Sequence, residues 1–265
     1  MEPDAKRPER PAELERHRAF VGPAETYDLV SAMQFNLLTF LGLREEHTLL
    51  DIGCGSLRAG RLFLVYLQPG NYFGLEPEEW LVREGIDREL GREIVAMKRP
   101  TFRHEREFLL TAFGRSFDYL VAQSIFSHTP QSQIAQCLSE AKKVLGPDSL
   151  FAATWMKGDL VYTGTDWVYP NCVTYPLAHI QGMVSEARLE SREIAWPHPN
   201  GQSWLVIFQP GNSRVPDPGD QERLAALQSE IAVTRQRYDD LRRHPWVRLG
   251  LWLNRLRRGT PHRKG

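Results

Sequence analysis

The stretch with the clearest chemical character is LLDIGCGSLRAG, residues 49–60, where an apolar run ends in an acid before a glycine-rich turn. Gly53 and Gly55 let the backbone approach a nucleotide closely. A dinucleotide-binding loop carries a third glycine that lets the pyrophosphate sit at a helix N-terminus, and Arg58 stands at that position here. The loop therefore predicts close approach to a ligand without pyrophosphate binding, which disfavours a nicotinamide dehydrogenase.

A second chemical group, the carboxylate of Glu76, ends the next apolar run and follows Gly53 by 23 residues. A carboxylate at this point accepts hydrogen bonds from both hydroxyls of an unphosphorylated ribose. A ribose without a pyrophosphate points to S-adenosylmethionine. A strand-to-helix turn without any ligand is the alternative for the loop, and the joint presence of the glycines and Glu76 argues against it.

The elements that would position these groups alternate along the chain, which predicts strands separated by helices in a mostly parallel sheet covered on both faces. The expected class is α/β: a Rossmann-like, doubly wound sheet that ends in an antiparallel hairpin with Asn200-Gly201 in its turn, followed by a C-terminal helical extension. The expected strands are 48–53, 71–76, 101–105, 117–126, 149–156, 189–196 and 203–209. The expected helices are 24–43, 61–67, 80–91, 131–145 and 177–187.

Composition divides the chain into five parts. They are a charged, proline-rich tail expected to be disordered (1–22), a ligand-binding domain (23–209), a Pro/Gly linker (210–220), a helical extension (221–258) and a basic tail (259–265).

Three stretches together, LLDIGCGSLRAG, YFGLEP and FDYLVAQSIFSHTP, resemble class I S-adenosylmethionine-dependent methyltransferases. The resemblance covers about residues 48–209, and the loop is similar to a GCGSLRxG form of a subset of bacterial methyltransferases. It implies methyl transfer with S-adenosylmethionine as cofactor. Many members have a further glycine near Leu57, which reaches a positive φ only at a cost, so we expect the loop to turn differently here.

The resemblance also implies a role for each matching position. The methionine and ribose portions would contact Asp51, Gly53, Cys54, Gly55 and Ser56, the ribose Glu76, and the adenine Glu107 and Phe108, while Gln123 and Ser124 would form the floor between cofactor and acceptor.

His128 follows Ser124 by four residues, just past an expected strand end. There it could accept a proton from an acceptor hydroxyl, because histidine titrates near neutral pH. The alternative is a structural histidine bonded to backbone at a helix start formed by Ser127, Thr129 and Pro130.

Residues 157–176 break the alternation and are rich in Gly, Pro and aromatic residues. Trp167 and Tyr169 could form a stacking wall for a sugar or an aromatic ring, or could pack the segment onto the sheet. The acids Asp159 and Asp166 do not match the magnesium site of catechol-type methyltransferases, so no metal is expected.

The composition bounds the setting of the protein. The 265 residues carry 33 basic and 33 acidic side chains, and three cysteines are too few and too scattered for a disulfide framework or a zinc site. The N-terminus lacks the apolar core of a signal peptide, and no run reaches the length of a membrane span. We therefore expect a cytoplasmic protein.

The end of the chain is basic, with eight Arg or Lys and no acid between residues 242 and 265. Residues 245–258 combine tryptophans and leucines with arginines, which fits a helix at a membrane surface on the inner face. Packing onto the main domain is the alternative, and nucleic-acid binding ranks lower.

Together these features predict O-methylation of a saccharide or small hydroxylated metabolite, so the expected partner is a small-molecule or glycan acceptor. The alternative is a non-catalytic S-adenosylmethionine-binding protein or a membrane-associated scaffold.

Overall fold

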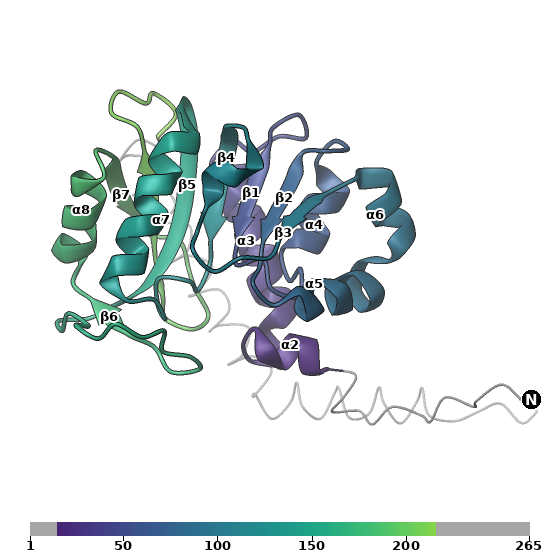
Figure 1. Ribbon diagram of the computed structural model, residues 1–265, viewed down its shortest axis with the longest axis horizontal. Helices are drawn as coiled ribbons and strands as arrows, with labels where there is room; N and C mark the ends of the chain where they lie inside the picture. Colours follow the sequence, from purple (N-terminus) through teal and green to yellow (C-terminus); the bar gives the residue numbers. More distant parts are fainter. Residues whose placement is uncertain (1–14, 216–265) are drawn as a thin grey trace, which may run out of the picture. The chain divides into compact units, whose positions relative to one another are not determined.

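A computed structural model describes residues 15–215, whose core is an eight-stranded sheet (Figure 1). The strand order is β3-β2-β1-β4-β5-β8-β7, and β6 pairs with β5 off this path. The strands are β1 (Leu49–Ile52), β2 (Tyr72–Leu75), β3 (Thr101–Arg103), β4 (Phe117–Ala122), β5 (Leu145–Lys157), β6 (Thr174–Tyr175), β7 (Glu190–Ile194) and β8 (Ser203–Phe208). The predicted extension 221–258 and basic tail 259–265 lie outside the described residues.

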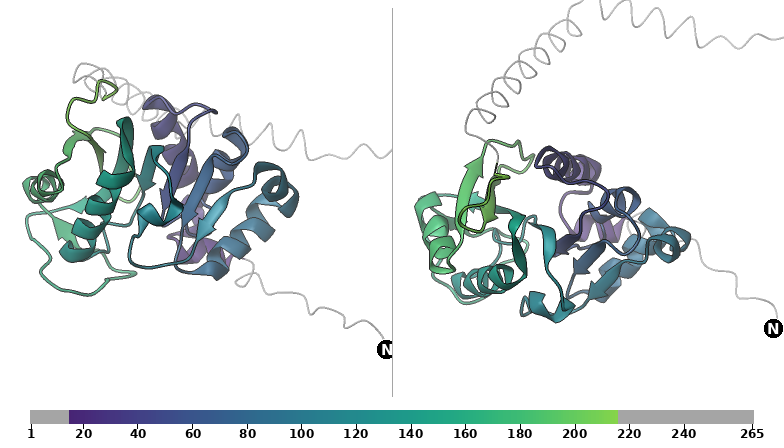
Figure 2. Two further views of the ribbon diagram at one scale, coloured as in Figure 1. Left: turned by 45° about the horizontal axis from the view of Figure 1, so that its top comes forward. Right: turned by 90° about the horizontal axis from the view of Figure 1, so that it is seen from above.

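Helices lie on both sides of this sheet when it is seen from above (Figure 2). The helices are α2 (Arg16–Phe20), α3 (Tyr27–Phe40), α4 (Gly60–Tyr66), α5 (Glu79–Gly85), α6 (Arg92–Lys98), α7 (Gln131–Val144) and α8 (Leu177–Glu186). Short 3-10 turns η1 (Ala24–Thr26) and η3 (Leu110–Phe113) and a π-helical turn η2 (Ile86–Leu90) complete the set within 15–215.

The strands alternate between two apolar cores, as the twofold side-chain period of a strand requires. In β4, Tyr119 and Val121 pack with residues of α3 and α4. Leu120 and Ala122 pack on the other face with residues of α7 and α8. Both faces are therefore covered, as the alternation of strands and helices along the chain predicted.

The predicted parallel sheet with a terminal antiparallel hairpin is confirmed. β1 pairs in parallel with β2 and β4, whereas β8 runs antiparallel to both β5 and β7. Gly201 has a φ of +71° in the hairpin turn, a conformation that glycine adopts without steric cost. The carboxyl ends of β1, β2 and β4 consequently meet at one edge of the sheet.

One local prediction was wrong, and one helix was not predicted. Residues 15–22 are not part of a disordered tail, because α2 is anchored by His17 and Arg18, whose side chains contact Glu89 at 2.7 and 2.6 Å. The helix expected over 80–91 is present as α5 followed directly by the π-helical turn η2, but a further helix that was not predicted, α6, begins after Gly91, which has a φ of +93°.

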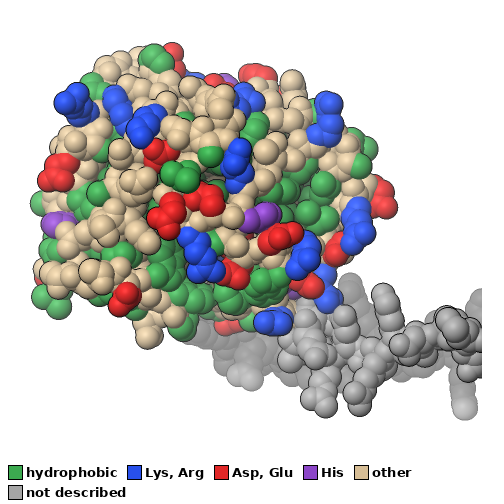
Figure 3. All heavy atoms as spheres, viewed as in Figure 1, with side chains coloured by type: hydrophobic (Ala, Val, Ile, Leu, Met, Phe, Trp, Pro, Cys, Tyr) green, Lys and Arg blue, Asp and Glu red, His purple; other side chains and the backbone are tan. Residues whose placement is uncertain are grey.

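Acidic and basic side chains are interspersed over the face of the molecule shown in Figure 3. Within residues 15–215, no helix is both long enough and apolar enough to cross a bilayer.

Gly85 is the contact point between α5 and the glycine loop, and a Cβ there would lie 2.3 Å from the carbonyl oxygen of Ser56. We expect Gly85→Ala to lower the free energy of unfolding by roughly 1–3 kcal/mol, because the backbone of the loop must shift. The matched control is Gly182→Ala in α8, where a Cβ meets nothing within 4 Å. That change should raise the free energy of unfolding by about 0.5–1 kcal/mol. Both changes are measured by urea unfolding, and an equal effect of Gly85→Ala and Gly182→Ala would contradict the close contact between Gly85 and Ser56.

Candidate active site

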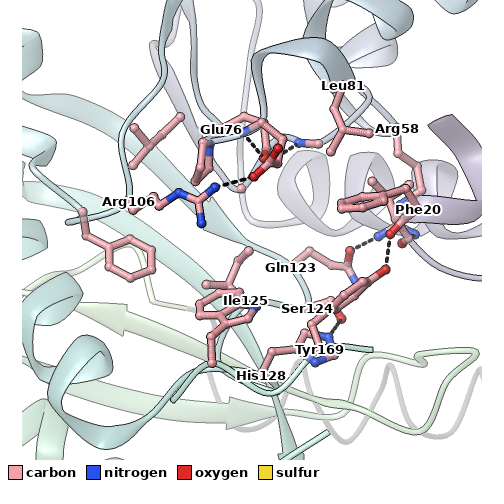
Figure 4. Close-up of a pocket in the computed structure, with 18 of the residues that line it drawn as sticks. Phe20, Arg58, Glu76, Leu81, Arg106, Gln123, Ser124, Ile125, His128 and Tyr169 are labelled. Atoms are coloured by element: carbon pink, nitrogen blue, oxygen red, sulfur yellow. Dashed lines mark hydrogen bonds and ion pairs between the residues drawn. The ribbon is translucent and has the colours of Figure 1, made fainter. Parts of the chain in front are cut away.

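A cavity of about 400 Å³ opens at the carboxyl ends of β1, β2 and β4 (Figure 4). Its walls come from the glycine loop after β1, from Glu76 after β2, and from Ser124 and His128 after β4. Phe20, from the N-terminal segment, and Tyr169, from the aromatic insert (residues 157–176), line its partly exposed mouth. Ligands of open parallel sheets bind at this edge, so the cavity is the candidate site.

The glycine loop needs its glycines for both conformation and space. Gly53 and Gly55 have φ angles of +72° and +55°. A Cβ on Gly53 would lie 2.1 Å from Ile125 Cδ1, and one on Gly55 would lie 2.7 Å from Val21 Cγ1. Both residues line the cavity, so the backbone itself forms this part of the wall.

The expectation that the loop would turn differently at Leu57 was wrong, because Leu57 itself takes a φ of +58°. Strain of this kind costs about 1–3 kcal/mol. The side chain is completely buried in the core shared with α3 and α4, a burial that stabilises by roughly 1.5–3 kcal/mol. Core packing at Leu57 thus offsets the strain of its positive φ.

Glu76 is buried at the pocket wall and joins two loops. Its Oε2 accepts a hydrogen bond from the Gly55 N–H and its Oε1 accepts one from the Glu78 N–H, each at 2.9 Å. Burial raises the pKa of the Glu76 carboxyl above its ordinary value, while both N–H groups act to lower it. Each oxygen keeps acceptor capacity for a ligand hydroxyl.

Only one of the two residues predicted to contact the adenine lines the cavity. Phe108 lines the cavity and has a φ of +51°. Glu107 is exposed and does not line the cavity, so that assignment was wrong. Glu105 and Arg106 line it instead, and Arg106 pairs with Glu78 at 2.5 Å. The strand before this segment is only three residues long, which left its register poorly marked in the sequence.

Three predicted loop residues do not line the main cavity. Asp51 and Cys54 line a side cavity of about 20 Å³, and Asp51 accepts a hydrogen bond from Tyr72 Oη at 2.8 Å. Burial raises the pKa of Asp51 to about 7. Ser56 is buried outside both cavities, 3.2 Å from Tyr27 Oη, and therefore ties the loop to α3 instead of facing a ligand.

Gln123 lines the cavity and connects Arg58 with His198, a histidine for which no role was expected. Its Oε1 accepts a hydrogen bond from Arg58, and its Nε2 donates to His198 Nε2 at 3.0 Å. Burial, and then the nearby Arg58 charge, lowers the pKa of His198 to about 4. A neutral His198 is the form that can accept this hydrogen bond.

His128 lines the cavity with a defined tautomer. Its Nδ1 faces the carbonyl oxygens of Val168 and Asn171 at 3.0 and 2.8 Å. Carbonyl oxygens only accept, so Nδ1 carries the proton and Nε2 of the neutral ring is the acceptor. Nε2 lies 3.4 Å from Ser124 Oγ, which itself accepts a hydrogen bond from Gln202 at 2.8 Å.

Aromatic rings gather around His128 at the cavity mouth. Tyr169 meets the His128 ring edge to face, with centroids 5.1 Å apart, and Trp167 lies at 6.4 Å. Both side chains are 43% exposed, so each keeps a free surface. Phe20, which the sequence did not single out, contacts Tyr169 through its ring at 5.7 Å and through its carbonyl oxygen.

Comparison with known proteins agrees with this architecture. Residues 50–151 match a family model described as a methyltransferase domain. A comparison with curated proteins gave no match.

Similar solved structures include the magnesium protoporphyrin IX methyltransferase ChlM from Synechocystis PCC 6803 with bound SAH, at 14% identity and a TM-score of 0.55, over 75% of this chain and 95% of that chain. DesVI of Streptomyces venezuelae is 13% identical, with a TM-score of 0.55 over 76% of this chain and 99% of that chain. The glycopeptide N-methyltransferase MtfA with bound SAH is 11% identical, with a TM-score of 0.52 over 69% and 90%. The chain therefore has the Rossmann-like fold of these proteins.

His198 makes stability depend on pH. Its folded pKa of about 4 lies below the ordinary 6.5, so the unfolded chain takes up this proton first as pH falls. The stability that neutral His198 contributes is complete above pH 6.5 and is lost as pH falls toward 4. We expect the melting temperature to fall more steeply over this range in wild type than in His198→Gln, which keeps an acceptor without titrating. If the melting temperatures of the two proteins differ by the same amount at every pH from 8 to 4, His198 is not the group that makes stability depend on pH.

Proposed function

We propose that the chain is an S-adenosylmethionine-dependent methyltransferase of class I, with the GCGSLRxG variant of the loop, that methylates a hydroxyl of a saccharide or small hydroxylated metabolite. One observation carries this proposal. The buried carboxylate of Glu76 faces a nucleoside-sized cavity beside a glycine loop that has Arg58 in place of a pyrophosphate-binding glycine.

The residues of the cavity fit the cofactor. Glu76 keeps acceptor capacity for ribose hydroxyls, and Phe108 presents an apolar ring for the adenine. Gly53 and Gly55 leave room for close approach along the backbone. A volume of about 400 Å³ lies within the usual range for small-molecule sites. When bound, S-adenosylmethionine supplies an activated methyl group.

The comparisons support the cofactor and leave room for several acceptors. ChlM was crystallised with SAM and with SAH, and MtfA with SAH. These two proteins are named for different acceptors, a magnesium porphyrin and a glycopeptide. The acceptor of this chain must therefore be inferred from its own cavity mouth.

At the mouth, His128 and the aromatic rings suit a hydroxylated acceptor. Carbonyl groups hold the protonated Nδ1 of His128, so Nε2, which lies 3.4 Å from Ser124 Oγ, is the ring atom that would accept the proton of a hydroxyl as the methyl bond forms. Trp167 and Tyr169 provide exposed ring faces beside it for a sugar or an aromatic ring.

The same contacts at His128 favour a second candidate, a non-catalytic S-adenosylmethionine-binding protein. Two carbonyls of the aromatic insert, those of Val168 and Asn171, are held by one histidine nitrogen, which is what a purely structural histidine would do. Cytoplasmic location with surface contact to a membrane through 245–258 stays a proposal, because that segment lies outside the described residues.

The ribose assignment predicts that Glu76→Ala weakens S-adenosylmethionine binding by roughly 1–3 kcal/mol, because hydrogen bonds to a charged group are lost. Isothermal titration calorimetry measures this directly. Glu186→Ala is the control, since Glu186 is an exposed carboxylate at the end of α8 and does not line the cavity. An affinity unchanged in Glu76→Ala would show that the ribose lies elsewhere.

The general-base assignment predicts a loss of turnover without a loss of cofactor affinity. His128→Asn keeps a donor near the position of Nδ1 and removes Nε2, so we expect kcat to fall by about 10²–10⁴-fold. The assay is transfer of a labelled methyl group to a panel of saccharides and hydroxylated aromatics, with His179→Asn, outside the cavity, as control. Unchanged turnover in His128→Asn would favour the structural role.

A further inference from the structure

Arg58 is a buried cation at the wall of both cavities, and its side chain is only 7% exposed. Burial lowers the pKa of Arg58 to about 10, which still leaves it charged at neutral pH. Among the residues that the structure describes, no carboxylate lies within ion-pair distance of it. A buried charge without a counter-ion is unfavourable, so this guanidinium suits an anion that enters from the cavity.

The guanidinium is held by neutral oxygens and retains donors. One nitrogen donates to the Val21 carbonyl oxygen at 2.7 Å, and another donates to Gln123 Oε1. A guanidinium has five N–H donors, so most remain for a ligand. Figure 4 shows Arg58 directed toward Gln123 at the edge of the cavity.

Gln123 orients the Arg58 guanidinium, and the orientation of Gln123 is in turn set by its two hydrogen-bond partners, Arg58 and His198. Arginine has no acceptor, so the carbonyl end of the Gln123 amide must face Arg58 and the NH₂ end must face His198. Val21 covers the opposite side, beneath the anchored segment that carries Phe20. A cation oriented in advance and shielded from water binds an anion more strongly than an exposed one does.

The acidic group on the other wall of the side cavity is Asp51. Asp51 and Arg58 influence one another electrostatically but do not form an ion pair. A cation and an acidic group at separate points of the cavity wall offer partners for a ligand end that carries both a carboxylate and an ammonium group, as an α-amino acid does.

We propose that Arg58 binds the carboxylate of the bound nucleoside and so selects ligands that keep an intact amino-acid end. This inference rests on the proposed function and adds to it a residue that determines cofactor specificity. It gives the arginine in the loop a role of its own, in place of the missing glycine.

The test compares S-adenosylmethionine with decarboxylated S-adenosylmethionine, which keeps the adenine, ribose, sulfonium and amino group. Affinities are measured calorimetrically for wild type, Arg58→Met, Arg58→Lys and Glu76→Ala. We expect Arg58→Met to bind S-adenosylmethionine roughly 10- to 100-fold more weakly, the effect of losing hydrogen bonds to a charged group. Its affinity for the decarboxylated compound should stay within about twofold, because no carboxylate contact is lost.

The other proteins separate a specific effect from a general one. Arg58→Lys keeps the positive charge but loses the planar guanidinium. Its affinity for S-adenosylmethionine should therefore lie between those of wild type and Arg58→Met. Glu76→Ala should lower the affinity for both compounds by the same factor, because both carry the ribose.

Equal losses for both compounds in Arg58→Met, or a wild type that binds both equally well, would overturn this inference while leaving the proposed function in place. A wild type that binds neither compound would overturn both.

Discussion

The site depends on the two hydrogen bonds that the carboxylate of Glu76 accepts from backbone N–H groups. Its two oxygens accept backbone N–H groups from Gly55 and Glu78, and so connect the loop after β1 to the turn before α5. These are the two loops that a nucleoside must contact. Parallel pairing of β1 with β2 brings them together, with Ile52 opposite Leu75 at the ends of the strands. A single buried charge thus fixes the shape of the wall and presents a polar group to the cavity.

Around this carboxylate the backbone is held in conformations that few residues adopt. Two non-glycine residues with positive φ, Phe108 and Ser124, line the cavity, and Leu57 supports the loop from below. The surrounding contacts are tight: Gly85 packs against Ser56, and Thr154 Oγ1 accepts the Ser124 N–H at 2.6 Å. Strained conformations persist only where packing dictates them, and they concentrate at functional sites.

Much of the fold was predictable because local sequence patterns indicate where its strands, helices and turns lie. The apolar run of β4, the glycines of the loop and the acid after β2 were all visible in the sequence, and β4 is buried along almost its whole length. Long-range contacts were not visible. The segment 15–22 is anchored through Glu89, 72 positions beyond His17, and Arg58 acquires its direction only from Gln123. Glu107 was misplaced because a three-residue strand gives no periodicity from which to set its register.

The central claim is that this cavity binds a nucleoside with a ribose and without a pyrophosphate. Isothermal titration of the wild-type protein with S-adenosylmethionine, S-adenosylhomocysteine and NAD tests it most directly. The account predicts saturable binding of the two sulfur compounds at one site per chain and no binding of NAD. Binding of NAD, or no binding of either sulfur compound, would contradict it.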